Sequence, residues 1–207
     1  MKTVTLVLLS VSIAAVVASC SSDAIEEHSQ KQPAQPSQTA SLGPEVVVQH
    51  FFTWYRPKRE FFATLPMVPA WLIDNGDTTD VYKIDFKVAE QYLGAFRSSG
   101  FVSEKYLSNE MGSIQKADSA MQADRQFVGP PQGINYDRVT FSQDPDADLE
   151  KLLRTEPTVK INGGTAQVYF AQLSKSEDLR EGADLEITLA QQQGKWLIEN
   201  IRPVFDK

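Results

Sequence analysis

The sequence has few of the side chains from which disulfide-bonded or metal sites are built. It has one cysteine, Cys20, and two histidines, His28 and His50, among 207 residues. A single thiol cannot form an intramolecular disulfide bond, so packing alone must hold the folded part together. His28 stands in a polar segment that lacks the further ligands a zinc site requires. We therefore predict no metal site.

Common cofactor and nucleotide motifs are also missing. Gly163-Gly164 falls in a predicted hairpin turn, and the chain has neither a glycine-rich phosphate loop nor a nucleophile elbow. Its 20 Lys and Arg are outnumbered by 27 Asp and Glu, which gives a formal net charge of −7. An acidic chain without a basic cluster argues against binding to nucleic acid. We predict no cofactor and no nucleic-acid partner.

One acidic stretch has the alternation of a calcium loop but not its other requirements. Asp144, Asp146 and Asp148 alternate, yet the sixth and twelfth positions are Leu149 and Thr155 instead of Gly and Glu. A proline after the first of these aspartates favours a helix cap and first turn. We predict that a helix begins here.

The sequence does have the layout of an export signal at residues 1–19. A positive start, Met1-Lys2, is followed by an apolar, uncharged run over residues 4–17. As a helix this run spans about 21 Å, short of the ~30 Å hydrocarbon core of a bilayer. A cleaved signal peptide is therefore favoured over a membrane span.

The junction Val17-Ala18-Ser19-Cys20 resembles the bacterial lipobox, in which the cysteine thiol receives a diacylglyceryl group before cleavage. The resemblance implies lipidation of Cys20 and a membrane partner that is reached through the lipid. Several acyl chains anchor a protein stably, whereas one does so only marginally. Ser21 and Ser22 follow, and in enteric-type bacteria the absence of Asp there implies an outer-membrane lipoprotein that faces the periplasm.

The residues after the cysteine predict a tether. The segment 20–43 is rich in Ser, Gln, Pro and Ala and has no apolar periodicity, so it cannot bury enough surface to fold. Such a chain reaches roughly 25–30 Å. The domain organisation predicted is a signal peptide at 1–19, a lipidated cysteine with its tether at 20–43, and a single domain at 44–207.

Apolar spacing and turn residues predict helices first and strands last in this domain. Helix-type spacing recurs from Pro44 to about Tyr55, where Pro57 interrupts it, and Ser103 caps a later helix. Helices before a meandering antiparallel sheet indicate the α+β class. The further predicted elements are helices at 85–100, 103–124 and from Asp144, a short strand at 137–142, a hairpin at 158–173, and strands at 183–190 and 194–204.

The last predicted strand carries apolar residues at both even-numbered and odd-numbered positions. Trp196 and Ile198 fall on one face, whereas Leu197 and Ile201 fall on the other. Both faces are therefore predicted to be covered, one by helices and the other by a partner. This leaves open a homodimer formed through the outer sheet face around Tyr169 and Leu197.

The closing stretch "GKWLIENIRP" resembles the last strand of nuclear-transport-factor-2-like domains. More narrowly, residues 51–55, 92–107, 131–137 and 141–146 ("FFTWY", "YLGAFRSSGFVSEKYL", "PQGINYD" and "FSQDPD") resemble a bacterial family of exported lipoproteins of unknown function with that fold. The resemblance implies N-terminal helices packed into a cone on a curved antiparallel sheet.

Enzymes with this fold, such as ketosteroid isomerase, place an acidic residue or a histidine together with a tyrosine in the cone. The corresponding candidates here are His50, Trp54, Tyr55, Tyr136 and Asp137. As neighbours on a strand, Tyr136 and Asp137 would point to opposite faces. This favours a packed Tyr136 and an Asp137 that binds loop amides over a catalytic pair.

The preferred hypothesis is a noncatalytic, lipid-anchored module of the cell envelope that binds a small molecule or an envelope protein. The alternative is a small-molecule isomerase, dehydratase or hydrolase that uses Asp137, His50 or Tyr136 in the cone pocket. A third hypothesis is a structural subunit that forms a dimer. The acidic composition and the absence of a catalytic set favour the first.

Overall fold

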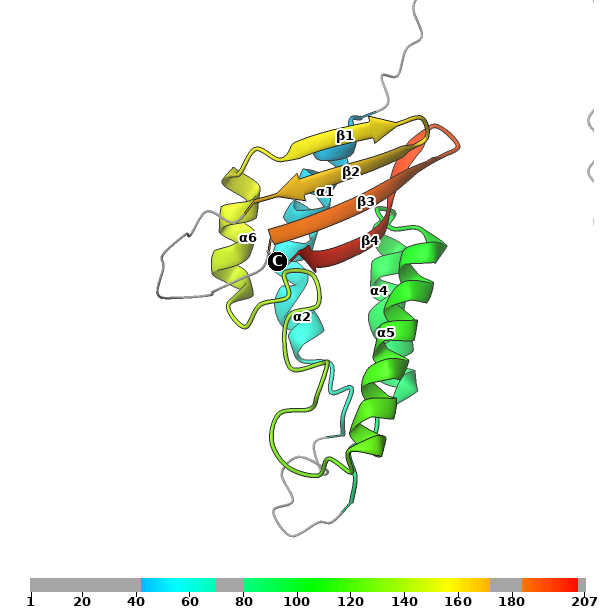
Figure 1. The fold of residues 1–207 in the computed structure, drawn as a ribbon, viewed down its shortest axis with the longest axis vertical. Helices are drawn as coiled ribbons and strands as arrows, with labels where there is room; N and C mark the ends of the chain where they lie inside the picture. The colour runs from blue at the N-terminus through cyan, green and yellow to red at the C-terminus, as the bar shows by residue number, and fades with distance from the viewer. Residues whose placement is uncertain (1–41, 70–79, 172–183, 205–207) are drawn as a thin grey trace, which may run out of the picture. The chain divides into compact units, whose positions relative to one another are not determined.

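Helices come first and a four-stranded antiparallel sheet comes last in the folded part of the chain (Figure 1). The computed structural model describes residues 42–69, 80–171 and 184–204. The predicted signal peptide, Cys20 and nearly all of the predicted tether lie outside the described residues. Residues 38–207 group into one unit by their contacts. The α+β class predicted from the order of elements is confirmed.

The first helix, α1 (Pro44–Tyr55), lies against one face of the sheet and contacts its second and fourth strands. A proline occupies its first turn, where the missing N–H costs no hydrogen bond. The short helices η1 (Arg56–Lys58) and α2 (Arg59–Ala63) follow without a gap. Helix α1 thus ends at Tyr55, as predicted from Pro57.

Helices α4 (Phe86–Ser99) and α5 (Glu104–Ala123) pack side by side. Gly100 ends α4 at φ +72°, a left-handed conformation that glycine adopts without strain. The Ser103 hydroxyl caps α5 by accepting a hydrogen bond of 3.2 Å from the N–H of its third residue. Phe86, the first residue of α4, is 39% exposed.

Helix α6 (Pro145–Arg154) begins at its predicted cap, since Asp144 Oδ1 accepts a hydrogen bond of 3.4 Å from a first-turn N–H. The short strand predicted at 137–142 is wrong. Asp137 and Ser142 form an isolated antiparallel bridge, and the residues between them turn, with Phe141 at φ +56°. The side chain of Asp137 closes this turn, as described below.

The sheet is a simple meander in the order β1-β2-β3-β4, with all neighbours antiparallel. Leu185, Ile187 and Leu189 are buried on the third strand and alternate with half-buried residues, as predicted. Phe52 of α1 meets Phe170 edge-on at 5.7 Å between ring centroids, so core side chains fill the space under the sheet. The strands are β1 (Thr158–Asn162), β2 (Thr165–Phe170), β3 (Asp184–Gln192) and β4 (Lys195–Val204).

An irregularity in β4 overturns the predicted facing of its side chains. Thr188 pairs with Asn200 but Leu189 pairs with Ile198, so Glu199 is an extra residue in the ladder. Such a bulge reverses the alternation beyond it. Ile198 and Ile201 are therefore both buried on the helix-covered side, at 0% and 6% exposure. Ile201 does not lie on the outer face with Leu197.

The link between α4 and α5 extends the sheet at the free edge of β4. The Ser103 N–H donates to the Ile198 carbonyl at 2.9 Å, and the Ile198 N–H donates to the Phe101 carbonyl at 2.9 Å. The neighbouring Val102 forms a parallel bridge with Ile198. These bonds satisfy edge groups of β4 and fix the helix pair beside the sheet.

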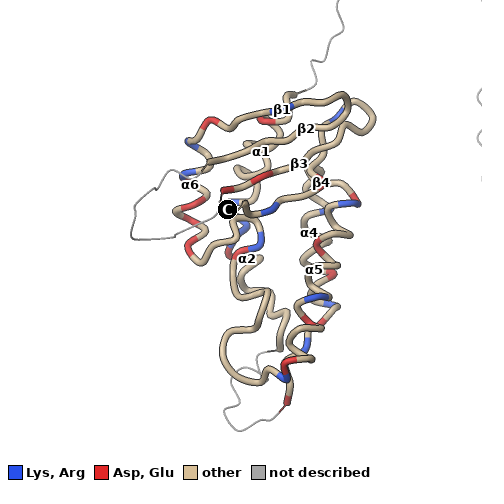
Figure 2. Tube along the Cα trace, viewed as in Figure 1, with Lys and Arg blue, Asp and Glu red and all other residues tan. Residues whose placement is uncertain are grey.

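Acidic and basic residues are interspersed along α5 and α6 (Figure 2). Helix α6 has acidic residues in its first turn and basic residues in its last, which suits the helix dipole at both ends. Within the described ranges, no helix has both the length and the hydrophobicity needed to cross a bilayer.

Candidate functional site

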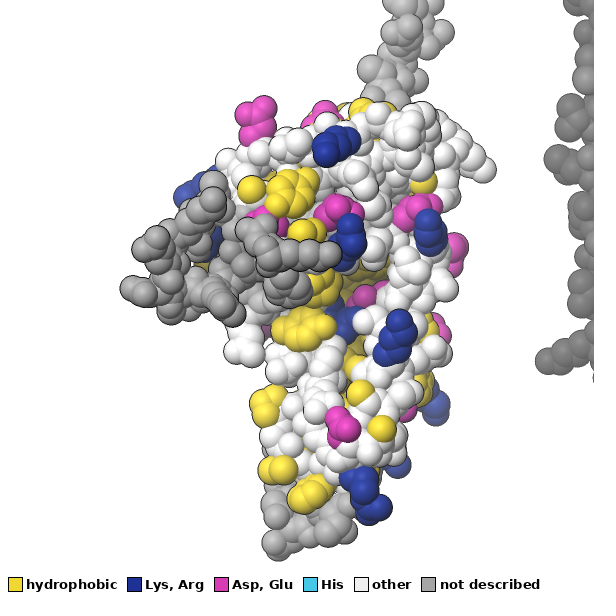
Figure 3. Space-filling view, in the orientation of Figure 1, with side chains coloured by type: hydrophobic (Ala, Val, Ile, Leu, Met, Phe, Trp, Pro, Cys, Tyr) yellow, Lys and Arg dark blue, Asp and Glu magenta, His cyan; other side chains and the backbone are white. Residues whose placement is uncertain are grey.

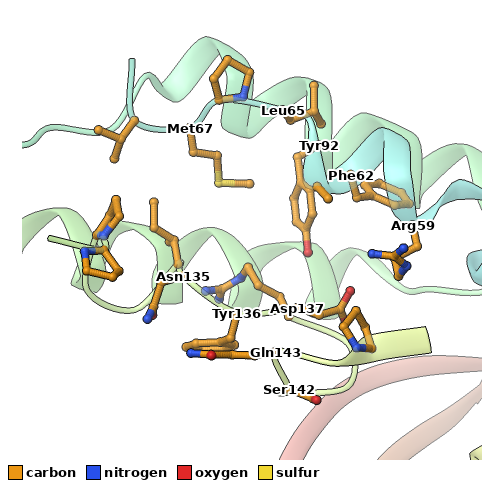
Figure 4. Close-up of a pocket in the computed structure, with 18 of the residues that line it drawn as sticks. Arg59, Phe62, Leu65, Met67, Tyr92, Asn135, Tyr136, Asp137, Ser142 and Gln143 are labelled. Carbon is orange, nitrogen blue, oxygen red and sulfur yellow. The ribbon is translucent and has the colours of Figure 1, made fainter. Parts of the chain in front are cut away.

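A cavity of about 610 Å³ lies between the C-terminal end of α1, α2, α4 and the 130–145 loop. Figure 4 shows α2 and the chain after it on one side and the 135–143 segment on the other, with the Tyr92 hydroxyl pointing into the gap. None of the described strands contributes a residue to its lining. The volume falls within the range of small-molecule sites, about 300–1,000 Å³.

The walls of the cavity are largely apolar and aromatic. Phe62, Leu65 and Met67 line it from α2 and the chain that follows, and Ile134 and Tyr136 line it from the loop. In the space-filling view, hydrophobic side chains gather at the level of α2, beside basic side chains (Figure 3). The lining therefore suits a ligand with a mainly apolar body.

The Asp137 carboxylate joins the loop to α1. Its Oδ1 accepts hydrogen bonds from the Val139 N–H at 3.0 Å, the Thr140 N–H at 2.8 Å and the Thr140 hydroxyl at 3.1 Å. Its Oδ2 accepts a bond of 2.6 Å from the Tyr55 hydroxyl. Both oxygens are thus engaged within the fold, and Asp137 binds loop amides as its sequence context predicted.

Tyr55 serves as a hydrogen-bond donor in this contact. Burial raises the pKa of its hydroxyl far above the usual range, and the charge of Asp137 and the hydrogen bond to it raise this pKa further. The phenol therefore stays protonated at neutral pH. Its ring stacks on Phe62 at 5.3 Å between centroids, so Tyr55 also forms part of the apolar wall.

A second buried polar group lies beside the first. The Arg138 Nε donates to Glu110 Oε1 in an ion pair whose side chains are 7% and 12% exposed, and its Nη1 donates to the Gly133 carbonyl at 2.7 Å. The Tyr92 hydroxyl donates to Glu110 Oε1 at 3.3 Å. Burial lowers the pKa of the Arg138 guanidinium, but the hydrogen bond to Glu110 and its charge outweigh this, so the guanidinium stays charged.

A more exposed ion pair holds the outer side of the cavity. Arg59 of α2 donates from Nε and Nη2 to the two carboxylate oxygens of Asp146, each at 2.7 Å. Two parallel bonds fix the relative orientation of the two side chains better than a single contact does. The pair therefore connects α2 to the first turn of α6 across the edge of the cavity.

The structure brings together three of the five predicted candidates. Tyr55, Tyr136 and Asp137 line the cavity, and the Tyr136 ring packs at 5.9 Å from a neighbouring phenylalanine. His50 is exposed on α1 and does not line the cavity. Trp54 is half-buried and packs into the aromatic core instead.

Sequence reasoning missed Arg59, Glu110 and Arg138 as site residues. The pairing of Glu110 with Arg138 joins residues 28 positions apart, so no local spacing rule indicates it. The one available signal was Arg138 itself, a charged side chain next to Asp137 in a segment expected to be half-buried.

No family model, curated protein or solved structure matches the chain. Among the described residues, no three His, Cys, Asp or Glu side chains lie close enough together to hold a metal ion. The site is therefore interpreted from its own geometry.

We predict that Tyr55→Phe lowers the free energy of unfolding by about 2 kcal/mol, because it removes a hydrogen bond to a carboxylate. Tyr106→Phe is the matched control. The Tyr106 hydroxyl is buried without a hydrogen-bond partner among the described residues, so its removal should leave stability unchanged or raise it by up to about 1 kcal/mol. Urea unfolding of the three proteins measures both changes, and an equal loss in the two variants would contradict this account.

Stability should fall at alkaline pH because of Tyr55, Tyr92 and Tyr106. Burial first, and the charge of Asp137 or Glu110 second, raises the pKa of each hydroxyl above its usual value of about 10. The folded state thus keeps protons that the unfolded state loses. Their contribution is complete below about pH 10 and is lost as pH rises further, by up to about 1.4 kcal/mol per pH unit for each tyrosine.

Urea unfolding between about pH 9 and about pH 11 tests this dependence. The Tyr55→Phe variant should lose stability less steeply than the unsubstituted protein, by up to about 1.4 kcal/mol per pH unit. Identical slopes would show that Tyr55 does not retain its proton in the folded state.

Proposed function

We propose that the chain is a lipid-anchored lipoprotein of the cell envelope whose folded domain binds a small, mainly apolar molecule without transforming it. The observation that carries the binding role is the cavity of about 610 Å³, walled by apolar and aromatic side chains and bordered by a few polar groups. Concave apolar sites with few polar groups are typical of ligand-binding pockets.

The hydrogen bonds of Asp137 support a noncatalytic role. A general base must reach the substrate proton with a free lone pair. Asp137 accepts four hydrogen bonds from the fold, one of them from Tyr55. A base role would have to use the second lone pair of Oδ2, the oxygen that already accepts the hydrogen bond from Tyr55. The alternative function, an isomerase, dehydratase or hydrolase, would use Asp137, His50 or Tyr136.

The lipobox-like junction at Cys20 supports the anchor. Ser21 and Ser22 after it favour an outer-membrane lipoprotein that faces the periplasm. A tether reaching roughly 25–30 Å would let the domain meet a ligand or an envelope protein away from the bilayer surface.

We also propose that the domain has the nuclear-transport-factor-2-like cone. Helix α1 against one face of an antiparallel meander and the bulge in β4 support this arrangement, because bulges bend a sheet. Core side chains fill the space under the sheet, so the binding site of this proposal lies beside the cone rather than within it.

The anchor predicts that cells fed an alkyne-bearing fatty acid label this protein. Label should be present on the unsubstituted chain and absent from Cys20→Ser, because the thiol is the only acceptor of its kind in the chain. In-gel fluorescence after coupling a dye to the alkyne measures the label. Undiminished label on Cys20→Ser would contradict attachment at this residue.

The binding role predicts that filling the cavity abolishes ligand retention. Native mass spectrometry of the full chain carrying Cys20→Ser, recovered from its own cell envelope, should show extra mass that disappears on denaturation. Adding Ala63→Trp should remove this mass because Ala63 lines the cavity, whereas Ala120→Trp, at an exposed site on α5, should keep it. Equal occupancy in both variants, or a ligand-free mass throughout, would contradict the proposal.

A further inference from the structure

Two carboxylates link the polar groups beside the cavity. The Asp137 and Glu110 carboxylates accept from Tyr55, Tyr92, Arg138 and the loop around Thr140. The Arg138 guanidinium is the cation of this cluster, and its side chain lines the cavity.

Arg138 lines the cavity and has a donor nitrogen without a hydrogen-bond partner among the described residues. Its Nε and Nη1 bond to Glu110 and to a carbonyl, but its Nη2 has no hydrogen-bond partner in the described part of the chain. The side chain lines the cavity, and Nη2 is not among the fully buried polar atoms that lack a partner. An acceptor atom of a ligand in the cavity can therefore reach it.

The charges around this donor select against an anionic ligand. Arg59, Asp137 and Arg138 line the cavity, and Asp146 and Glu110 pair with the two arginines, so these five side chains sum to −1. Glu110 already neutralises Arg138 at contact distance, and the apolar walls would leave an added carboxylate poorly solvated. A cationic group would bring only donors and would be repelled by the guanidinium. A neutral acceptor such as a carbonyl oxygen satisfies the unused donor at no cost in charge.

We propose that the cavity binds neutral, mainly apolar molecules that carry a carbonyl oxygen, which accepts a hydrogen bond from Arg138 Nη2. This inference rests on the proposed function, because it names the ligand class for the same cavity. The apolar walls around Phe62 and Ile134 contact the body of the ligand, and Arg138 sets the position of its oxygen.

Three probes of nearly the same shape test the inference. Acetophenone has a carbonyl, α-methylstyrene replaces the carbonyl oxygen by a methylene group, and benzoate carries a charge. Titration into the isotope-labelled full chain carrying Cys20→Ser, followed by heteronuclear NMR at neutral pH, gives each affinity and the residues affected. We expect acetophenone to bind about fivefold more tightly than α-methylstyrene, the ratio that one hydrogen bond supplies, and benzoate to bind most weakly.

The double variant Glu110→Leu/Arg138→Met removes the donor and both charges while retaining volume, a type of replacement that folded proteins often tolerate. In this variant, acetophenone and α-methylstyrene should bind with about equal affinity. The control Glu104→Leu/Arg97→Met removes an exposed ion pair between α4 and α5 and should keep the fivefold ratio. If the first variant fails to fold, the ranking in the unsubstituted cavity still decides the inference.

The outcomes separate the two proposals. Equal binding of acetophenone and α-methylstyrene, or tightest binding of benzoate, with shifts at the cavity residues would overturn the carbonyl preference and leave the binding role standing. No shift at Tyr92, Tyr136 or Arg138 with any probe would overturn both.

Discussion

The site depends on the hydrogen bonds that the Asp137 carboxylate accepts. The carboxylate closes the turn after it through the Val139 and Thr140 amides and accepts a hydrogen bond from Tyr55, 82 positions earlier in the chain. A carboxylate that accepts several hydrogen bonds is expensive to leave unpaired in a partly buried place. The hydrogen bond from Tyr55 thus fixes the loop to the end of α1, at a place where both residues line the cavity.

The Arg138–Glu110 pair adds orientation rather than stability to the same region. Burying two charges costs several kcal/mol of hydration per ion, which their attraction offsets only when the remaining hydrogen bonds are made. Here Gly133 and Tyr92 supply two of those bonds, and Nη2 of Arg138, whose side chain lines the cavity, has no partner among the described residues. Asp137 and Arg138 are neighbours in the sequence. One short segment therefore positions both the carboxylate that accepts bonds from the fold and the guanidinium that keeps an unpaired donor.

What could be predicted from the sequence is what depends on neighbours along the chain. The Ser103 and Asp144 caps, the Gly100 end of α4 and the inward residues of β3 all follow from local spacing and backbone preference. The Glu199 bulge could not be predicted, because alternation assumes that every residue of a strand is paired. The strand expected at 137–142 failed for a related reason, since the Asp137 side chain takes the amides that a ladder would use.

The candidate site shows the same division between local and long-range information. Tyr55, Tyr136 and Asp137 were candidates because the resemblance implies an acidic residue or a histidine together with a tyrosine in a pocket, and they line one cavity. The long-range pairing of Arg138 with Glu110 could not be read from the sequence, yet it decides which ligand atoms the cavity favours. Because the strong acceptors are engaged within the fold and a donor is open, the site is better suited to holding a neutral acceptor than to abstracting a proton.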